Sequence, residues 1–141
     1  MLRAATAFCV VLLLSLSIQA AEGPTLPDGA KGFAGQLRGT VVEKVAKGKG
    51  FRLKVAAIGK TFPKNTASNP QVLVGESVLI NAQWRKGENG KWHPVENHIR
   101  FIRSLKPGQE ITIEVINDEG GRLHILELTH EQRNVGEGER R

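Results

Sequence analysis

The chain has 141 residues, of which 24% are charged and 40% are hydrophobic, and its formal net charge is +6. This length fits one domain with a single modest core. The only cysteine, Cys9, lies near the N-terminus. Disulfides therefore cannot stabilise the rest of the chain, and metal sites built from thiolates are excluded there.

Residues 1–20 have the layout of a secretory signal peptide. Arg3 supplies a positive charge, residues 8–14 form an apolar run, and Ile18-Gln19-Ala20 gives a cleavage signature after Ala20. An uncleaved membrane anchor is the alternative, but the run is short for a membrane span of about 20 residues. We therefore expect a periplasmic or secreted protein whose mature chain has no transmembrane span.

Charge is distributed unevenly along the chain. Residues 31–106 contain 15 Lys or Arg and 4 Glu, whereas residues 107–141 contain 4 Arg and 8 acidic residues. A basic body of this kind favours anionic polymers, anionic membrane surfaces or acidic proteins as partners. The alternative is that the charges only keep the protein in solution.

Residues 21–35 predict a flexible arm before the folded body. They contain Pro24, Pro27 and several glycines, and they show no apolar period. Phe33 is the residue of this arm that we expect to attach it to the barrel.

Two strands and a hairpin turn are expected next. Residues 36–46 predict the first strand, with Val41 and Val45 on one face. Residues 47–50 contain two glycines and predict a turn. Residues 51–55 alternate apolar and basic side chains, which is typical of a second strand with one buried face.

A polar loop and a third strand follow. Residues 59–71 contain two prolines and a run of small polar side chains, and a loop of this length on a small scaffold is either functional or mobile. Residues 72–83 hold the third strand, with Gly75 marking its start.

Residues 84–92 predict a hairpin with a tryptophan on each arm. Asn89-Gly90 is a strong turn signal, and it lies between Trp84 and Trp92. The two indoles are therefore expected near each other. Because tryptophan is usually buried, the alternative is that one or both complete the hydrophobic core.

The segment that follows fits two patterns. Ile99 and Phe101 have the spacing of a strand, whereas Ile99 and Ile102 have the spacing of a helix, with Asn97 as a possible cap. We expect a short strand at residues 98–101 and then a helical turn.

The clearest hairpin spans residues 106–128. Ile111, Ile113 and Val115 alternate with polar side chains, and a glycine-containing turn and a second apolar run follow. A lone hairpin is marginally stable in water, so this one must pack on the other strands. Residues 129–141 predict a charged tail without ordered structure.

Basic side chains interleaved with aromatic ones are the candidate binding residues. Cations beside flat rings suit sugar rings, nucleotide bases or acidic polymers. The candidates lie on the second strand, its loop and the tryptophan hairpin, and they are Arg52, Lys54, Lys60, Lys64, Trp84, Arg85, Lys86, Lys91 and Trp92.

The residue types of common catalytic and metal sites form no recognisable set. No serine lies in a Gly-x-Ser-x-Gly motif, and no histidine pair has a spacing typical of zinc ligands. Glu110 and Glu114 could form a carboxylate pair, which keeps a hydrolase as a third hypothesis. We predict a protein that is not an enzyme, with no catalytic residues, no metal and no cofactor.

From residue 36 to residue 128 the pattern resembles the small β-barrels of the OB-fold group. The matching features are the hairpin around residues 47–50, the strand near residues 75–83 and the closing hairpin after Gln109. The resemblance implies a five-stranded barrel that often binds oligonucleotides or oligosaccharides on strands two and three. The tryptophan hairpin is extra, and the usual helix before strand four is reduced or absent.

The expected fold class is therefore all-β. After an N-terminal signal helix, residues 36–128 should form a small closed or partly open antiparallel barrel of five to six strands, OB-like or alternatively SH3-like. The function we expect is that of an exported, non-catalytic binding module for an anionic polymer or an envelope partner protein. Export argues against intracellular nucleic acid. The alternative is a structural or assembly module of a larger envelope complex.

Overall fold

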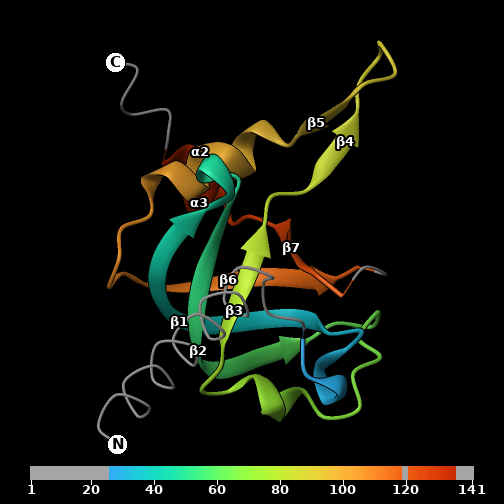
Figure 1. Cartoon of the computed structure of the whole chain (residues 1–141), viewed down its shortest axis with the longest axis vertical. Helices are drawn as coiled ribbons and strands as arrows, with labels where there is room; N and C mark the ends of the chain where they lie inside the picture. The colour runs from blue at the N-terminus through green and yellow to red at the C-terminus, as the bar shows by residue number, and fades with distance from the viewer. Residues whose placement is uncertain (1–25, 119–120, 136–141) are drawn as a thin grey trace, which may run out of the picture.

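The structure, a computed structural model, describes residues 26–118 and 121–135 (Figure 1). The predicted signal peptide, residues 1–20, lies outside the described residues. So do the first part of the predicted arm and the last residues of the predicted tail. Among the described residues, no helix has the length and apolar content to cross a membrane.

Five strands close into a barrel in the order β1-β2-β3-β7-β6, with β6 returning to pair with β1. Their bounds are Ala34–Val45 for β1, Gly50–Thr61 for β2, Ser77–Asn81 for β3, Glu110–Asn117 for β6 and Leu123–Glu127 for β7. The barrel confirms the prediction of a small all-β barrel. It differs at one pairing, because β3 and β7 run parallel where an antiparallel pair was expected.

Strand β1 belongs to two ladders, because it pairs with β2 on one side and with β6 on the other. A shift in the β1–β2 register falls between Arg38 and Gly39. A Cβ atom on Gly39 would lie only 2.1 Å from the carbonyl oxygen of Lys54. The glycine therefore lets the two backbones approach closely where β1 bends around the barrel.

The core fills the barrel with alternating side chains from each strand. On the closing hairpin, Ile111, Ile113 and Val115 are buried, as their period predicts. Phe33 is fully buried and joins the same core. Phe33 lies between the 3-10 helix η1 (Asp28–Ala30) and Ala34, the first residue of β1.

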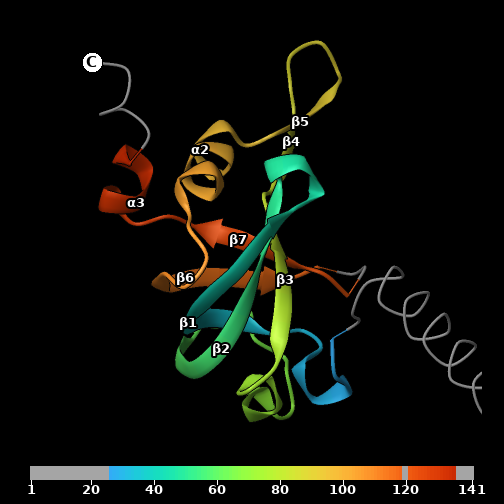
Figure 2. The ribbon, with the colours of Figure 1, turned by 60° about the vertical axis from the view of Figure 1, so that its left-hand side comes forward.

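Helix α2 (Glu96–Ser104) lies at one end of the barrel, and η1 and η3 (Pro70–Leu73) lie together at the other (Figures 1 and 2). The predictions of a short strand at residues 98–101, and of a reduced or absent helix before the fourth barrel strand, are wrong. His98, Phe101 and Ile102 are all buried, and this spacing is that of one helix face packed on the core.

A two-stranded ribbon projects from the barrel beside α2 (Figure 2). It consists of β4 (Trp84–Lys86) and β5 (Trp92–Pro94) and confirms the predicted tryptophan hairpin. The ribbon leaves and rejoins the body at one place, because the backbone N–H of Val95 donates to the carbonyl of Gln83 at 2.7 Å.

The region after residue 128 is more ordered than expected. Residues His130–Asn134 form helix α3, so the prediction of a tail without ordered structure is wrong for these residues. Thr129 caps α3 by accepting from the backbone N–H of Gln132, and the Gln132 side chain accepts in return from the Thr129 N–H. The Gln132 amide also donates to the carbonyl of Thr112 at 2.8 Å, which attaches α3 to β6.

Candidate functional site

The two faces of the ribbon carry different side chains. Trp84 pairs with Pro94, Arg85 with His93, and Lys86 with Trp92. Paired residues share a face and successive residues alternate between faces. Trp84, Lys86 and Trp92 therefore lie on one face, and Arg85 lies on the other.

Both tryptophans are exposed to solvent. Trp84 retains 42% of its accessible surface and Trp92 retains 62%. The alternative in which the indoles complete the core does not hold for either residue. Such exposure is unusual for a side chain that is normally well buried, and it leaves two flat apolar surfaces available for contact.

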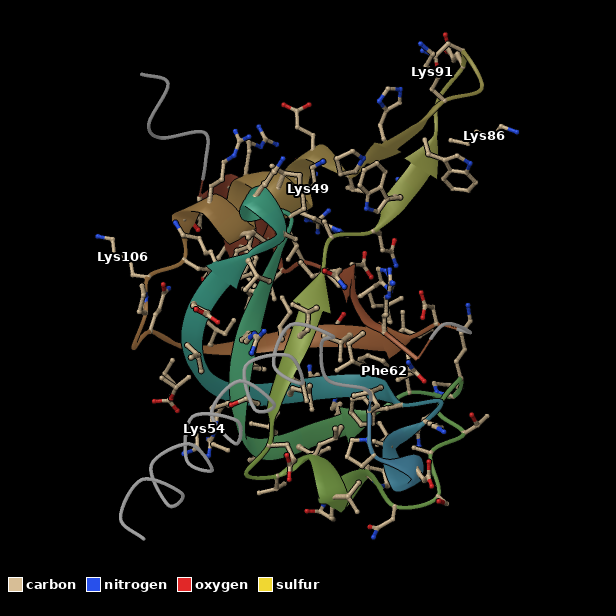
Figure 3. The ribbon with its side chains drawn as sticks, in the orientation of Figure 1. Lys49, Lys54, Phe62, Lys86, Lys91 and Lys106 are labelled. Carbon is tan, nitrogen blue, oxygen red and sulfur yellow. The ribbon has the colours of Figure 1, made fainter. Side chains whose placement is uncertain are left out.

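A lysine from another element adds a charge to this face. Lys49 lies in the turn between β1 and β2, and its Nζ is 5.2 Å from the centre of the Trp84 ring. This distance is within the range of a cation–π contact. We call Lys49, Trp84, Lys86 and Trp92 together the ribbon face. In Figure 3, Lys49, Lys86 and Lys91 lie toward the same end of the molecule.

The sequence pattern predicts only that Lys49 lies in a turn. The signal for its role lies in the topology. The N–H of Ala82 donates to the carbonyl of Lys49 at 2.9 Å, because β2 begins where its antiparallel partner β3 ends. The turn before β2 must therefore lie beside whatever segment follows β3, and in this chain that segment is the ribbon.

The remaining predicted cations do not join the ribbon face. Arg52 is half-buried on β2, with its Nε 3.4 Å from Glu43 of β1. Lys54 is exposed on β2 and lies toward the other end of the molecule in Figure 3. Lys60 is about 26 Å from Arg52 along the strand, and Lys64 follows β2 in the next loop. The predicted candidate residues are thus divided between the ribbon and other parts of β2 and the loop that follows it.

The opposite face of the ribbon borders a polar cleft of about 470 Å³. The cleft is formed by the base of the ribbon, α2, the end of β7 and α3. Its lining residues are Gln83, Arg85, Val95, Asn97, His98, Leu126, Glu127, Leu128 and Arg133. Of these, only Arg85 was among the candidate binding residues predicted from the sequence.

His98 is the most buried polar side chain of the cleft, with 5% of its surface exposed. Its Nδ1 accepts a hydrogen bond of 3.1 Å from the backbone N–H of Gln83. Burial, and then the nearby Arg85 charge, lower the pKa of His98 to about 4. The ring is therefore neutral at pH 7, and its proton resides on Nε2.

The other cavities and acidic pairs are small or widely spaced. A pocket of about 90 Å³ beside β3 is lined mainly by apolar side chains, including Leu26 and Leu123. The Cα atoms of Glu110 and Glu114 are about 13 Å apart along one strand. This spacing is wider than the separation of the carboxylate pair in glycosidases. Within the described ranges, no group of three His, Cys or acidic side chains is placed to hold a metal ion.

Comparison of the chain with protein-family models, with curated proteins and with solved structures gave no match.

Proposed function

We propose that this protein is an exported, non-catalytic, OB-like module that binds an acidic polysaccharide through the ribbon face. The OB-like assignment is supported by the strand order, by the parallel β3–β7 pair and by the helix that precedes β6. OB-like barrels commonly use strands two and three and the adjoining loops for polymers. In this chain the first hairpin turn and the ribbon after β3 occupy that region.

The observation that carries the proposal is the pairing of two exposed indoles with cations on one face. Flat apolar rings can pack against the faces of sugar rings, while Lys49 and Lys86 are positioned to attract the acidic groups. Lys91 adds a third cation at the ribbon tip, and Glu88 is the single carboxylate between residues 83 and 95. The local charge therefore favours a polyanion over a basic partner.

A polysaccharide is favoured over a single-stranded nucleic acid because the predicted leader directs the chain out of the cytoplasm. Both polymers combine negative charge with stackable rings. The choice between them is therefore tested directly, by measuring the affinity for a uronic acid polymer such as alginate and for an oligothymidylate.

The test compares two charge reversals of equal size. Lys49→Glu with Lys86→Glu alters the ribbon face, whereas Lys54→Glu with Lys60→Glu alters β2 outside it. We expect the first pair to weaken alginate binding at least tenfold and to flatten its salt dependence, and the second pair to change the affinity less than threefold. Equal losses in both variants, or none in either, would contradict the proposal. Tighter binding of oligothymidylate than of alginate would indicate that the ligand is a single-stranded nucleic acid and not a polysaccharide.

An assembly role is the second candidate, and the ribbon supports it too. Among the described residues, β4 and β5 pair only with each other, so each has an outer edge that can accept another strand. If the ribbon joins copies of the chain, light scattering should detect a mass that rises with concentration. Replacing Trp92 by alanine should then abolish the rise, and a constant monomer mass would exclude this self-association.

A further inference from the structure

We propose that the polar cleft behind the ribbon is a second binding site, for a small hydroxylated carboxylate the size of one uronic acid residue. The cleft borders the ribbon on the Arg85 side, and no residue of the ribbon face lines it. This site therefore goes beyond the proposed polymer surface and can be tested separately.

Two guanidinium groups from different elements line the cleft. Arg85 comes from β4 and Arg133 from α3. Within the described part of the chain neither forms an ion pair, although Glu127 lines the same cleft. Two unpaired arginines at one cavity are suited to a carboxylate, because the guanidinium group presents parallel N–H donors to it.

The cleft also contains groups that suit hydroxyls. His98 uses Nδ1 to accept from Gln83, and its Nε2–H has no hydrogen-bond partner among the described residues. The Asn97 carbonyl oxygen accepts from Arg100, so its amide nitrogen remains available as a donor. The Glu127 carboxylate can accept from hydroxyls of a ligand.

Size and net charge narrow the class of ligand. A volume of about 470 Å³ is ample for one sugar ring and much larger than an inorganic anion requires. Val95, Leu126 and Leu128 provide apolar wall for the carbon skeleton. With His98 neutral, two arginines and one glutamate leave a single positive charge, which a monoanion balances. A zwitterionic amino acid would leave that charge uncompensated, and a phosphate dianion would overcompensate it.

The binding experiment uses calorimetry or NMR titration of the chain with sodium glucuronate. Glucose, alanine and inorganic phosphate serve as comparison ligands. We expect glucuronate to bind at least tenfold more tightly than each of them. Absence of glucuronate binding would overturn the proposal. Equal binding of phosphate or alanine would overturn the assignment of a hydroxylated carboxylate.

Variants locate the binding in the cleft. Arg85→Gln and Arg133→Gln should each weaken glucuronate binding at least fivefold. Arg103→Gln is the matched control, because it removes an exposed arginine of α2 that does not line the cleft, and it should leave the affinity unchanged. Trp84→Ala with Trp92→Ala should also leave it unchanged, even where alginate binding is lost. Glucuronate binding that depends on the tryptophans but not on the arginines would place the sugar on the ribbon face and overturn the cleft site.

Discussion

The side-chain nitrogen of Lys49 lies 5.2 Å from the centre of the Trp84 ring, and this contact joins the β1–β2 turn to the ribbon. The two residues are far apart in sequence, because Lys49 lies in the turn before β2 of the barrel and Trp84 begins the separate two-stranded sheet. The contact covers part of one indole, whereas the Trp92 indole has no cation over it among the described residues. The two tryptophans therefore present different surfaces to a ligand.

The cation–π contact should shield Trp84 from small solutes. In a Trp92→Phe background, where Trp84 is the single tryptophan, Lys49→Ala should increase the quenching of its fluorescence by acrylamide. The loss of folding stability should stay below about 1 kcal/mol, since exposed cation–π contacts contribute about that much. Lys47→Ala, which removes a lysine of the same turn, is the control. Equal quenching in the two variants would show that Lys49 does not cover the ring.

Stacking and charge should respond differently to salt. Trp92→Ala should weaken alginate binding by about 1–3 kcal/mol if a sugar ring stacks on indole as a nucleic-acid base does. That loss should persist at high salt, whereas the loss caused by Lys86→Ala should shrink as salt screens the charge. Affinities at low and high salt check both expectations. A tryptophan effect that disappears at high salt would indicate that the indole only positions the lysine.

Burial of His98 should make folding stability depend on pH. Its pKa is lowered to about 4 by burial and then by Arg85, from 6.5 in the unfolded chain. Between these values the unfolded chain binds a proton that the folded chain does not. The contribution of neutral His98 to the free energy of unfolding is therefore fully present above pH 6.5. The free energy of unfolding falls by up to about 3 kcal/mol as the pH drops to 4. Urea unfolding at several pH values measures this slope.

The variant His98→Asn keeps an acceptor for the Gln83 N–H and removes the titration. It should flatten the slope between pH 6.5 and 4. A smaller slope will remain, because burial also lowers the pKa of His124. An unchanged slope in His98→Asn would show that His98 does not titrate as described.

Close packing at the bend of β1 should make Gly39 intolerant of a side chain. In Gly39→Ala the new Cβ would lie 2.1 Å from the Lys54 carbonyl oxygen, so the backbone must move. We expect a loss of about 3 kcal/mol in unfolding free energy. At Gly59, in the same ladder, a Cβ would meet mainly the Gln36 side chain, which can move away. Gly59→Ala should therefore cost about 1 kcal/mol or less, and equal losses would contradict this explanation.

The attachment of α3 to the barrel depends on Gln132. Gln132→Ala removes its bond to the Thr112 carbonyl and half of the capping box with Thr129. Amide exchange at residues 130–134 should become faster, while the global stability changes by about 1 kcal/mol or less. Glu131→Ala, one residue away, should leave exchange nearly unchanged. Because Arg133 lies on α3, Gln132→Ala should also weaken glucuronate binding.

Local pattern was sufficient for most strands of this fold. The alternation of Ile111, Ile113 and Val115 predicted β6, and Asn89-Gly90 predicted the ribbon turn, where Gly90 adopts a φ of 77°. In both cases the information lies within a few neighbouring residues. Side-chain alternation and turn chemistry are therefore enough to identify the hairpins.

Helix α2 was missed because its sequence satisfies two periods at once. Ile99 and Phe101 have strand spacing, but Ile99 is only partly buried and the buried stripe runs through His98, Phe101 and Ile102. Asn97, expected as a cap, lies inside the helix, and Val95 at the N-cap offers no side-chain hydrogen bond. The helix is therefore stabilised by packing on the barrel, which the local sequence does not encode.

Two features depend on segments that are far apart in the sequence. They are the closure of the barrel by the parallel β3–β7 pair and the separation of the predicted binding residues into different regions. The β3–β7 pair contains two residue pairs and joins strands separated by the ribbon, α2 and β6. Similarly, Lys60 follows Arg52 closely in sequence but lies far along an extended strand, while Lys49 reaches Trp84 across a gap in sequence. Order along the chain thus predicted the kinds of side chain at the site better than their arrangement.

The hydrogen bond between Gln83 and Val95 means that the ribbon is an insertion whose two ends already meet. The chain between them can be shortened, lengthened or exchanged for another loop while the path of the backbone into α2 stays the same. A lineage carrying this scaffold could therefore acquire a new specificity by altering a single excursion of the chain, without reinventing the barrel that supports it.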